Sequence, residues 1–163
     1  MRQQHPEPFD PPSVNSRVAE PTLRQFREKP GVLVVDDDHL VRCVLQLGLQ
    51  RNGFEVWLAS NGRKAIDLYR EHREDIDVVL LDVQMPGLDG PQTLDNLCQM
   101  NPEVLACFIG DNLGAYEPEE LLMYGAAHAI AKPFPLEQLV NILRRLTNRV
   151  PVDLLPCEKV FQE

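Results

Sequence analysis

Acidic residues stand at the ends of two apolar segments that lie far apart in the sequence. Asp36, Asp37 and Asp38 follow the run VLVV, and Asp82 follows the run VVLL. Neighbouring carboxylates repel one another, so bringing them together costs free energy unless a cation is close. Mg²⁺ prefers oxygen ligands and is typically held by one or two carboxylates together with phosphate oxygens. These residue types favour a site for Mg²⁺ and phosphate, if the fold brings the two segment ends together.

A lysine adds positive charge to this set of acids. Lys132 ends a short apolar segment and precedes Pro133, which favours an extended backbone at the lysine. Its ammonium group can pair with a phosphoryl group. Carboxylates, a metal ion and a lysine around one further carboxylate suit phosphoryl transfer to that carboxylate. Taken singly, Asp36 and Asp37 could instead cap a helix, and Lys132 could be a surface lysine.

The apolar patterns predict five strands that alternate with five helices. Continuous apolar runs, often β-branched, predict strands at 32–35, 54–59, 77–82, 104–109 and 127–131. Helical spacing and flanking Asn, Pro and Gly signals predict helices within 39–53, 61–74, 91–100, 117–125 and 136–148. This alternation is typical of an α/β fold with a parallel sheet and helices on both faces. In the flavodoxin-like strand order 2-1-3-4-5, the first and third strands are neighbours, so their acidic ends meet.

Composition excludes several classes of function. The 163 residues carry a net charge of -9, whereas non-specific nucleic-acid binding needs clustered Lys and Arg. No apolar run approaches the roughly 18 residues of a membrane span, and the N-terminus lacks the apolar core of a secretory signal. The four cysteines lack the spacing of zinc ligands and indicate a reducing compartment. We expect a cytoplasmic protein that binds neither nucleic acid nor a membrane.

The chain divides into three parts. Residues 1–29 hold five prolines and few aliphatic residues, and are expected to form a flexible extension. Residues 30–148 carry the predicted strands and helices, and residues 149–163 form a short tail. The tail is too short for a DNA-binding domain, so we expect a stand-alone domain.

Three motifs carry a resemblance to a known family. VLVVDDD, VVLLDVQMPGLDG and AKPF, in this order, resemble the receiver domain of response regulators in two-component signal transduction, a CheY-like domain. The resemblance covers residues 30–148. It implies that Asp82 is the phosphoacceptor and that Lys132 contacts the phosphoryl group. It also implies a cis peptide bond between Lys132 and Pro133.

The resemblance further implies a ligand set for Mg²⁺. Asp36 and Asp37 match the acidic pair that organises the ion, and Asp37 matches the direct ligand. Asp82 and the main-chain carbonyl of Gln84 match the remaining protein ligands. Asp38 stands at a variable position of the family, and we interpret it as the cap of the first helix.

Two positions depart from the family pattern. Members usually carry Ser or Thr at the end of the fourth strand, where this chain has Gly110, followed by Asp111. They often carry an aromatic residue three places before the lysine, where this chain has Ala129. Gly110 can still offer its main-chain N–H to a phosphoryl group, but a charge-assisted hydroxyl hydrogen bond of about 1.5–3 kcal/mol is lost. The site for phosphorylation is therefore complete, while both parts of the usual switch are missing.

The leading hypothesis is a stand-alone receiver that takes a phosphoryl group onto Asp82. The donor would be a sensor histidine kinase, a phosphotransfer protein or a small phosphodonor, and the output would be contact with a downstream protein. Such a receiver phosphorylates itself but is not a turnover enzyme. The sequence names neither the kinase nor the target, and it leaves a weak homodimer open.

Three alternatives use the same residues differently. Gly110 and Ala129 also suit a degenerate receiver that binds partners without phosphorylation. A phosphatase of the haloacid-dehalogenase type fits the pattern Asp36-x-Asp38, but it gives no role to VQMPGLDG or AKPF. A flavodoxin-like nucleotide-binding protein is the weakest alternative, because no glycine-rich phosphate loop follows the first strand.

Overall fold

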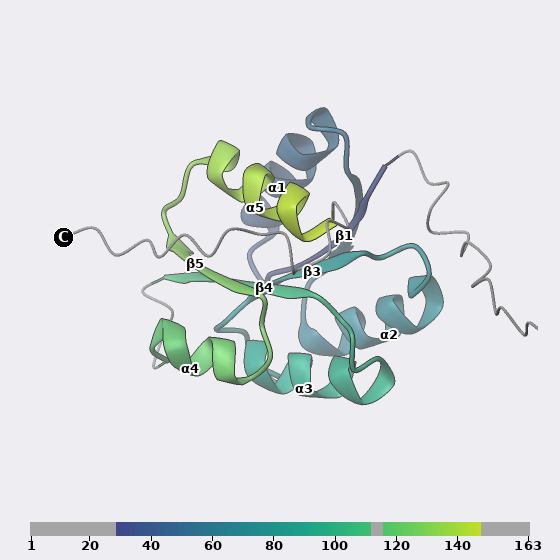
Figure 1. Cartoon of the computed structure of the whole chain (residues 1–163), viewed down its shortest axis with the longest axis vertical. Coiled ribbons are helices and arrows are strands. Elements are labelled where there is room, and N and C mark those ends of the chain that lie inside the picture. The colour runs from purple at the N-terminus through teal and green to yellow at the C-terminus, as the bar shows by residue number, and fades with distance from the viewer. Residues whose placement is uncertain (1–28, 112–115, 148–163) are drawn as a thin grey trace, which may run out of the picture.

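The computed structural model describes residues 29–111 and 116–147, and the structural statements below concern these residues (Figure 1). Apart from Lys29, the extension expected over residues 1–29 lies outside the described residues, and so does the tail expected over 149–163.

The described residues form one five-stranded parallel sheet. The strands run in the spatial order β2-β1-β3-β4-β5, which confirms the predicted flavodoxin-like order. Their bounds are β1 Gly31–Val35, β2 Glu55–Ala59, β3 Val78–Asp82, β4 Ala106–Asp111 and β5 His128–Lys132.

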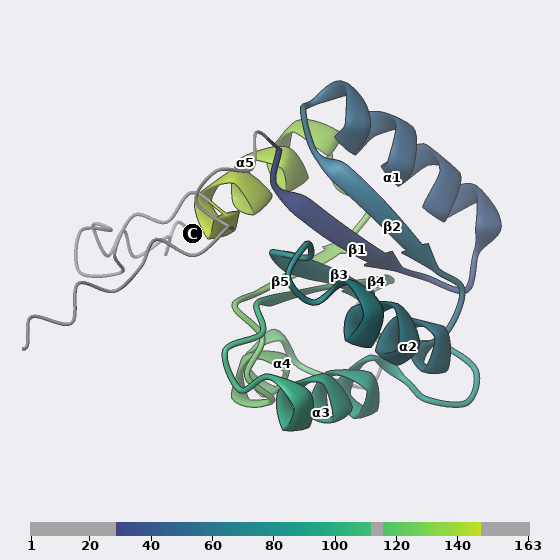
Figure 2. The same cartoon turned by 90° about the vertical axis from the view of Figure 1, so that its right-hand side faces the viewer.

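Five described helices cover both faces of this sheet, as the alternating pattern predicts. They are α1 His39–Arg51, α2 Gly62–His72, α3 Gly90–Met100, α4 Pro118–Met123 and α5 Leu136–Thr147. Helices α1 and α5 lie on one face, and α2, α3 and α4 lie on the other (Figure 2). In the described residues no helix is long and apolar enough to cross a membrane.

The central strands are buried along their whole length. Every residue of β1 and β3 is buried, which explains why VLVV and VVLL are continuous apolar runs rather than alternating ones. Leu33 and Val35 join the core beneath α2 and α3, whereas Val32 and Val34 join the core beneath α1 and α5. Because the apolar runs end where β1 and β3 end, the acids that follow or close them lie at the carboxyl edge of the sheet.

All five strands differ from their predicted bounds at one or both ends, and β4 differs most. The fourth strand was expected at 104–109, but β4 begins at Ala106 because the N–H of Val104 closes a turn on the carbonyl of Asn101. The strand continues to Asp111, where it pairs with Lys132. The third helix begins at Gly90 rather than at Pro91, because Asp89 is its N-cap and forms a capping box.

Helix α1 exposes an apolar stripe to solvent. Leu40, Val44 and Leu47 are 72%, 66% and 57% exposed, and they are spaced to lie on one side of the helix. Leu45 and Leu49 of the same helix are buried against the sheet. We call the three exposed residues the α1 stripe; it follows directly on the acids at the end of β1.

Candidate functional site

Three carboxylates meet at the carboxyl edge of the sheet. Oxygens of Asp36, Asp37 and Asp82 lie within 4.8 Å of one another, so the three could hold one metal ion. Asp36 is 0% exposed and Asp82 is 7% exposed, while Asp37 is open to solvent. They converge because β1 and β3 are paired in register, with Val35 opposite Leu81, so both strands end at the same level. We call these three residues the acid site.

Lys132 reaches the acid site from the end of β5, a strand at the edge of the sheet. Its Nζ donates a hydrogen bond to Oδ2 of Asp36 at 2.9 Å and lies 3.7 Å from Oδ1 of Asp82. Burial by itself lowers the pKa of Lys132, but the hydrogen bond to Asp36 and the charge of Asp82 raise it above its ordinary value. The ammonium group is therefore charged. The cis peptide bond expected between Lys132 and Pro133 is confirmed.

Asp82 has the most strongly shifted carboxyl group of the site. Burial raises its pKa from 3.8 to about 6; the charge of Lys132 opposes this shift, and the charge of Asp36 adds to it. The main-chain N–H of Gln84 donates a hydrogen bond that also lowers the pKa, and Asp37 raises it. Asp82 is thus a crowded, poorly solvated carboxylate near neutral pH, which a cation would relieve.

Asp36 differs from its two partners in that hydrogen bonds already hold it. Its Oδ1 accepts from the N–H of Asp38 at 2.8 Å, and its Oδ2 accepts from Lys132. Arg42 also donates to the main-chain carbonyl of Asp36 at 2.6 Å. Asp36 is therefore fixed in place and orients Lys132 toward Asp82.

Asp38, rather than Asp36 or Asp37, is the N-cap of α1. Its Oδ1 accepts hydrogen bonds from the N–H groups of Leu40 at 2.7 Å and Val41 at 3.4 Å, which confirms its interpretation as the cap of α1. Asp36 does not cap the helix, because its oxygens are directed to Asp38 and Lys132.

The two departures from the family pattern lie on neighbouring strands. Gly110 is buried in β4 opposite Ala131, one residue before the pair formed by Asp111 and Lys132. The charge of Asp111 contributes to the raised pKa of Lys132, so a further acid does act on the site. Ala129 is partly buried opposite Phe108. The phosphate-binding role of the Gly110 main chain stays a prediction.

Sequence reasoning missed one residue beside the loop that follows Asp82. The Tyr116 hydroxyl hydrogen-bonds to Oδ2 of Asp89 at 3.5 Å. The same tyrosine helps to line a pocket of about 470 Å³ with Gln84, Met85 and Pro86. No local pattern connects Tyr116 with this loop, because 27 residues separate it from Asp89.

The doubly wound sheet and the acids at its switch point define the class of protein: a flavodoxin-like α/β domain with a cluster of carboxylates at its carboxyl edge. The family model of the response regulator receiver domain matches residues 32–144. The chain therefore belongs to the response regulator receiver family, whose members serve two-component signalling.

Individual relatives agree with this assignment. Response regulator MprA of Mycolicibacterium vanbaalenii is 38% identical over 122 residues, which are 75% of this chain and 52% of the relative. The chain spans about half the length of the curated relatives it matches. The stand-alone architecture therefore stays a prediction.

Solved structures show the same fold. A receiver domain from Clostridium thermocellum has a TM-score of 0.69 at 24% identity, covering 74% of this chain and 95% of that one. The CheX–CheY complex with BeF₃ and Mg²⁺ from Borrelia burgdorferi has a TM-score of 0.67 at 28% identity, covering 72% of this chain and 88% of that one.

Proposed function

We propose that this receiver accepts a phosphoryl group on Asp82 in a Mg²⁺-dependent reaction and signals through protein contacts. The observation that carries the proposal is the convergence of Asp37, Asp82 and Lys132 at one edge of the sheet, although they come from three different strand ends. A purely structural role does not explain why two buried carboxylates lie beside an exposed one. Nor does it explain why one lysine lies close to both buried carboxylates.

The proposed chemistry needs one nucleophile and fixed positive charge. A carboxylate oxygen of Asp82 attacks the phosphorus atom of the donor, the bond from phosphorus to the donor's leaving atom breaks, and an acyl phosphate forms. Lys132 lies 3.7 Å from that carboxylate and stabilises the charge on the transferring oxygens. Asp36 holds Lys132 in this position. The main-chain N–H of Gly110 would add a further donor.

The acid site suits Mg²⁺ by the chemistry of its donors. All of them are carboxylate oxygens, which this hard cation prefers. Because hydrogen bonds engage both oxygens of Asp36, we assign direct ligation to Asp37 and Asp82, with the main-chain carbonyl of Gln84. Bound Mg²⁺ would supply positive charge beside the transferring phosphoryl group. The CheX–CheY complex from Borrelia burgdorferi contains BeF₃ and Mg²⁺, which supports Mg²⁺ as the cation proposed for this chain.

The test is to incubate the chain with a small phosphodonor and Mg²⁺ and to measure its intact mass. We expect a gain of one phosphoryl group that disappears when Mg²⁺ is chelated. Peptide mapping after borohydride trapping of the acyl phosphate should locate the group at Asp82. No gain with any small phosphodonor would contradict the proposal.

Binding of Mg²⁺ should strengthen as the pH rises through 6. The raised pKa of Asp82 means that a proton occupies this carboxylate below about pH 6, and the cation must displace it. Calorimetry should give an affinity about tenfold weaker at pH 5 than at pH 7, with proton release at the lower pH. In Asp82→Asn the pH dependence should flatten; an unchanged profile in this variant would assign the proton to another group.

The protein donor is proposed to be a sensor histidine kinase or a phosphotransfer protein that docks on the α1 stripe. Its apolar side chains stand beside the acid site and are exposed, as expected of a protein contact. The double variant Val44→Ser/Leu47→Ser should slow transfer from such a protein by about tenfold. Transfer from a small phosphodonor should stay unchanged.

The control for the α1 stripe is Gln50→Ser, another exposed position of α1. Stopped-flow or gel-based transfer assays should use a purified phosphotransfer protein that phosphorylates the unmodified chain. Equal slowing with the small phosphodonor would show that the double variant damages the acid site, and would contradict docking at α1.

A second candidate function is a receiver that binds its partner without phosphorylation. Gly110 and Ala129 favour it, since the residues of the usual switch are missing at both positions. It predicts that Asp82→Ala leaves partner binding unchanged. The crowded, poorly solvated Asp82 carboxylate argues for the phosphorylated mode, because a constitutive module gains nothing from it.

A further inference from the structure

One stretch of the chain combines many acids with no permanent cation. Residues 74–131 hold eleven Asp and Glu residues and neither Lys nor Arg. This stretch supplies the strands β3 and β4 and the helices α3 and α4, and the two helices lie on one face of the sheet beside α2 (Figure 2). A local excess of acids attracts cationic partners and repels anionic ones.

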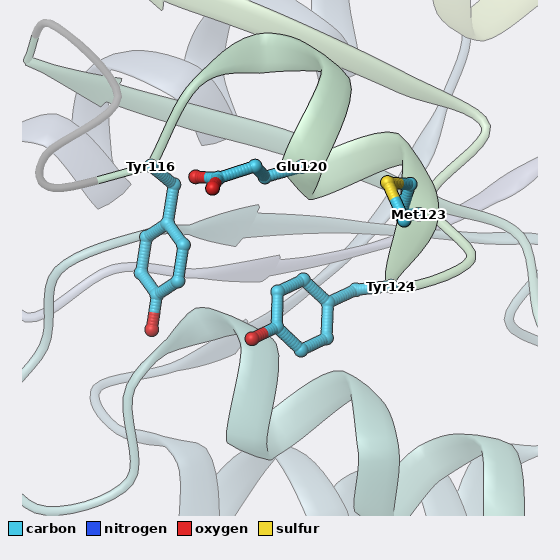
Figure 3. Close-up of a pocket in the computed structure, with 4 residues that line it drawn as sticks. All are labelled: Tyr116, Glu120, Met123 and Tyr124. Atoms are coloured by element: carbon cyan, nitrogen blue, oxygen red, sulfur yellow. The ribbon is translucent and has the colours of Figure 1, made fainter.

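A pocket of about 530 Å³ opens on this acidic side, at α4. Tyr116, Glu120, Met123 and Tyr124 line it, and we call it the α4 pocket (Figure 3). Figure 3 shows the two tyrosine rings reaching from opposite ends of the helix toward the same space, with the Glu120 carboxylate turned toward Tyr116. The ring centroids are 5.9 Å apart and the ring planes are perpendicular.

This geometry suits a cation. Tyr116 and Tyr124 each bring a ring to the pocket, and a cation over a ring face within about 6 Å of its centroid is attracted to the ring. Glu120 adds a carboxylate to the wall of the same pocket. One of its oxygens accepts from the N–H of Glu117 at 3.0 Å, which holds the side chain in place and leaves its charge unneutralised. The charge of Asp89 raises the pKa of Tyr116, as expected in a negative field.

Two side chains that line the α4 pocket offer exposed apolar surface. Met123 and Tyr124 are 86% and 51% exposed on this short helix. Tyrosine and methionine are enriched in protein interfaces, where aromatic rings stack with arginine. A planar guanidinium can lie on a ring face and hydrogen-bond to a carboxylate at the same time, whereas a lysine ammonium is a strongly hydrated point charge.

We propose that the α4 pocket binds an arginine side chain presented by an apolar segment of a protein partner. The proposal rests on the proposed function in taking protein contact as the output of the receiver. It does not require phosphorylation of Asp82, so each of the two can fail without the other.

The test is an NMR titration of the ¹⁵N-labelled chain in saturating Mg²⁺, which keeps guanidinium away from the acid site. The probe is acetyl-Leu-Arg-Leu-amide, and the matched neutral probe has citrulline in place of arginine. We expect the arginine peptide to shift the amide signals of Glu120, Met123 and Tyr124, with at least about fivefold tighter binding than the citrulline peptide. Equal binding of the two peptides would overturn the proposal.

Variants locate the binding site. Glu120→Gln keeps an oxygen for the hydrogen bond from Glu117 but removes the charge, and Tyr124→Leu removes one ring. Each should weaken binding about fivefold. Glu119→Gln makes the same charge change at an exposed position that does not line the α4 pocket, and should leave binding unchanged. If Glu119→Gln and Glu120→Gln weaken peptide binding equally, the effect comes from the overall negative charge of this region. That result would overturn the assignment of binding to the α4 pocket.

Two further compounds test which chemical group the α4 pocket recognises. Acetyl-Leu-Lys-Leu-amide should bind more weakly than the arginine peptide, and equal binding would overturn the preference for guanidinium. Acetyl-arginine-amide should also bind more weakly, since it lacks flanking side chains that can contact Met123. Equal binding would show that the ligand is a small guanidinium compound rather than a protein segment, and would overturn the proposal.

Discussion

Asp82→Asn should lower Mg²⁺-dependent phosphorylation by a small phosphodonor at least about hundredfold, because the nucleophilic oxygen is replaced by an amide. The remaining acids cannot substitute for it: Asp36 has both oxygens in hydrogen bonds, and Asp37 is well exposed to solvent. Intact-mass spectrometry over a time course of donor exposure measures the loss directly.

The matched control is Asp38→Asn, which makes the same change at the carboxylate that caps α1 and lies outside the acid site. Asparagine caps helices as well as aspartate does, so α1 should keep its first hydrogen bonds. Phosphorylation of Asp38→Asn should stay within about twofold of the unmodified chain. Phosphorylation of Asp82→Asn at a normal rate would assign the acceptor role to another residue.

Unfolding cannot account for the loss in Asp82→Asn. The folded-state pKa of Asp82 is about 6 against 3.8 for the ordinary carboxyl group, so the folded chain holds this proton more tightly than the unfolded chain. Its contribution to stability is therefore present at low pH and is lost as the pH rises through 6. At pH 7 without Mg²⁺, removing the charge should raise the free energy of unfolding rather than lower it.

The sequence predicts the strand order and the edge where the acids meet because both depend on strong local signals. VLVV and VVLL are continuous apolar runs of the kind typical of central strands, and the acids follow them directly. The start of β4 was predicted two residues early, since the turn between Val104 and Asn101 depends on a main-chain hydrogen bond that apolar patterning does not report.

The division of labour within the site needed the structure. Sequence reasoning placed Asp36 and Asp37 in one acidic pair with Asp37 as the direct ligand of Mg²⁺. The structure adds that Asp36 is buried and accepts a hydrogen bond from Lys132. The apolar residues of α1 predict a helix but exceed what one buried face can hold, so only coordinates identify Leu40 and Val44 as exposed. The α4 pocket depends on side-chain directions at two ends of a short helix, which no periodic pattern encodes.

Lys132→Met should lower the free energy of unfolding by about 3 kcal/mol in the absence of Mg²⁺, because it leaves a buried carboxylate without its cation. Asp36 is 0% exposed, and the 2.9 Å hydrogen bond from Lys132 neutralises it. Lys132→Met should also slow phosphorylation by about a hundredfold through the loss of fixed positive charge beside Asp82. Urea denaturation followed by circular dichroism measures the first effect, and the mass assay measures the second.

The double variant Asp36→Asn/Lys132→Met separates the two roles of the lysine. It removes the uncompensated charge as well as the ammonium group, so most of the lost stability should return, while phosphorylation should stay slow. Lys64→Met, at an exposed position of α2, is the control and should change stability by less than about 0.5 kcal/mol. If the double variant is no more stable than Lys132→Met, the ion pair with Asp36 is not what holds this edge of the sheet together. If phosphorylation recovers with stability, the lysine acts only by keeping Asp36 neutralised.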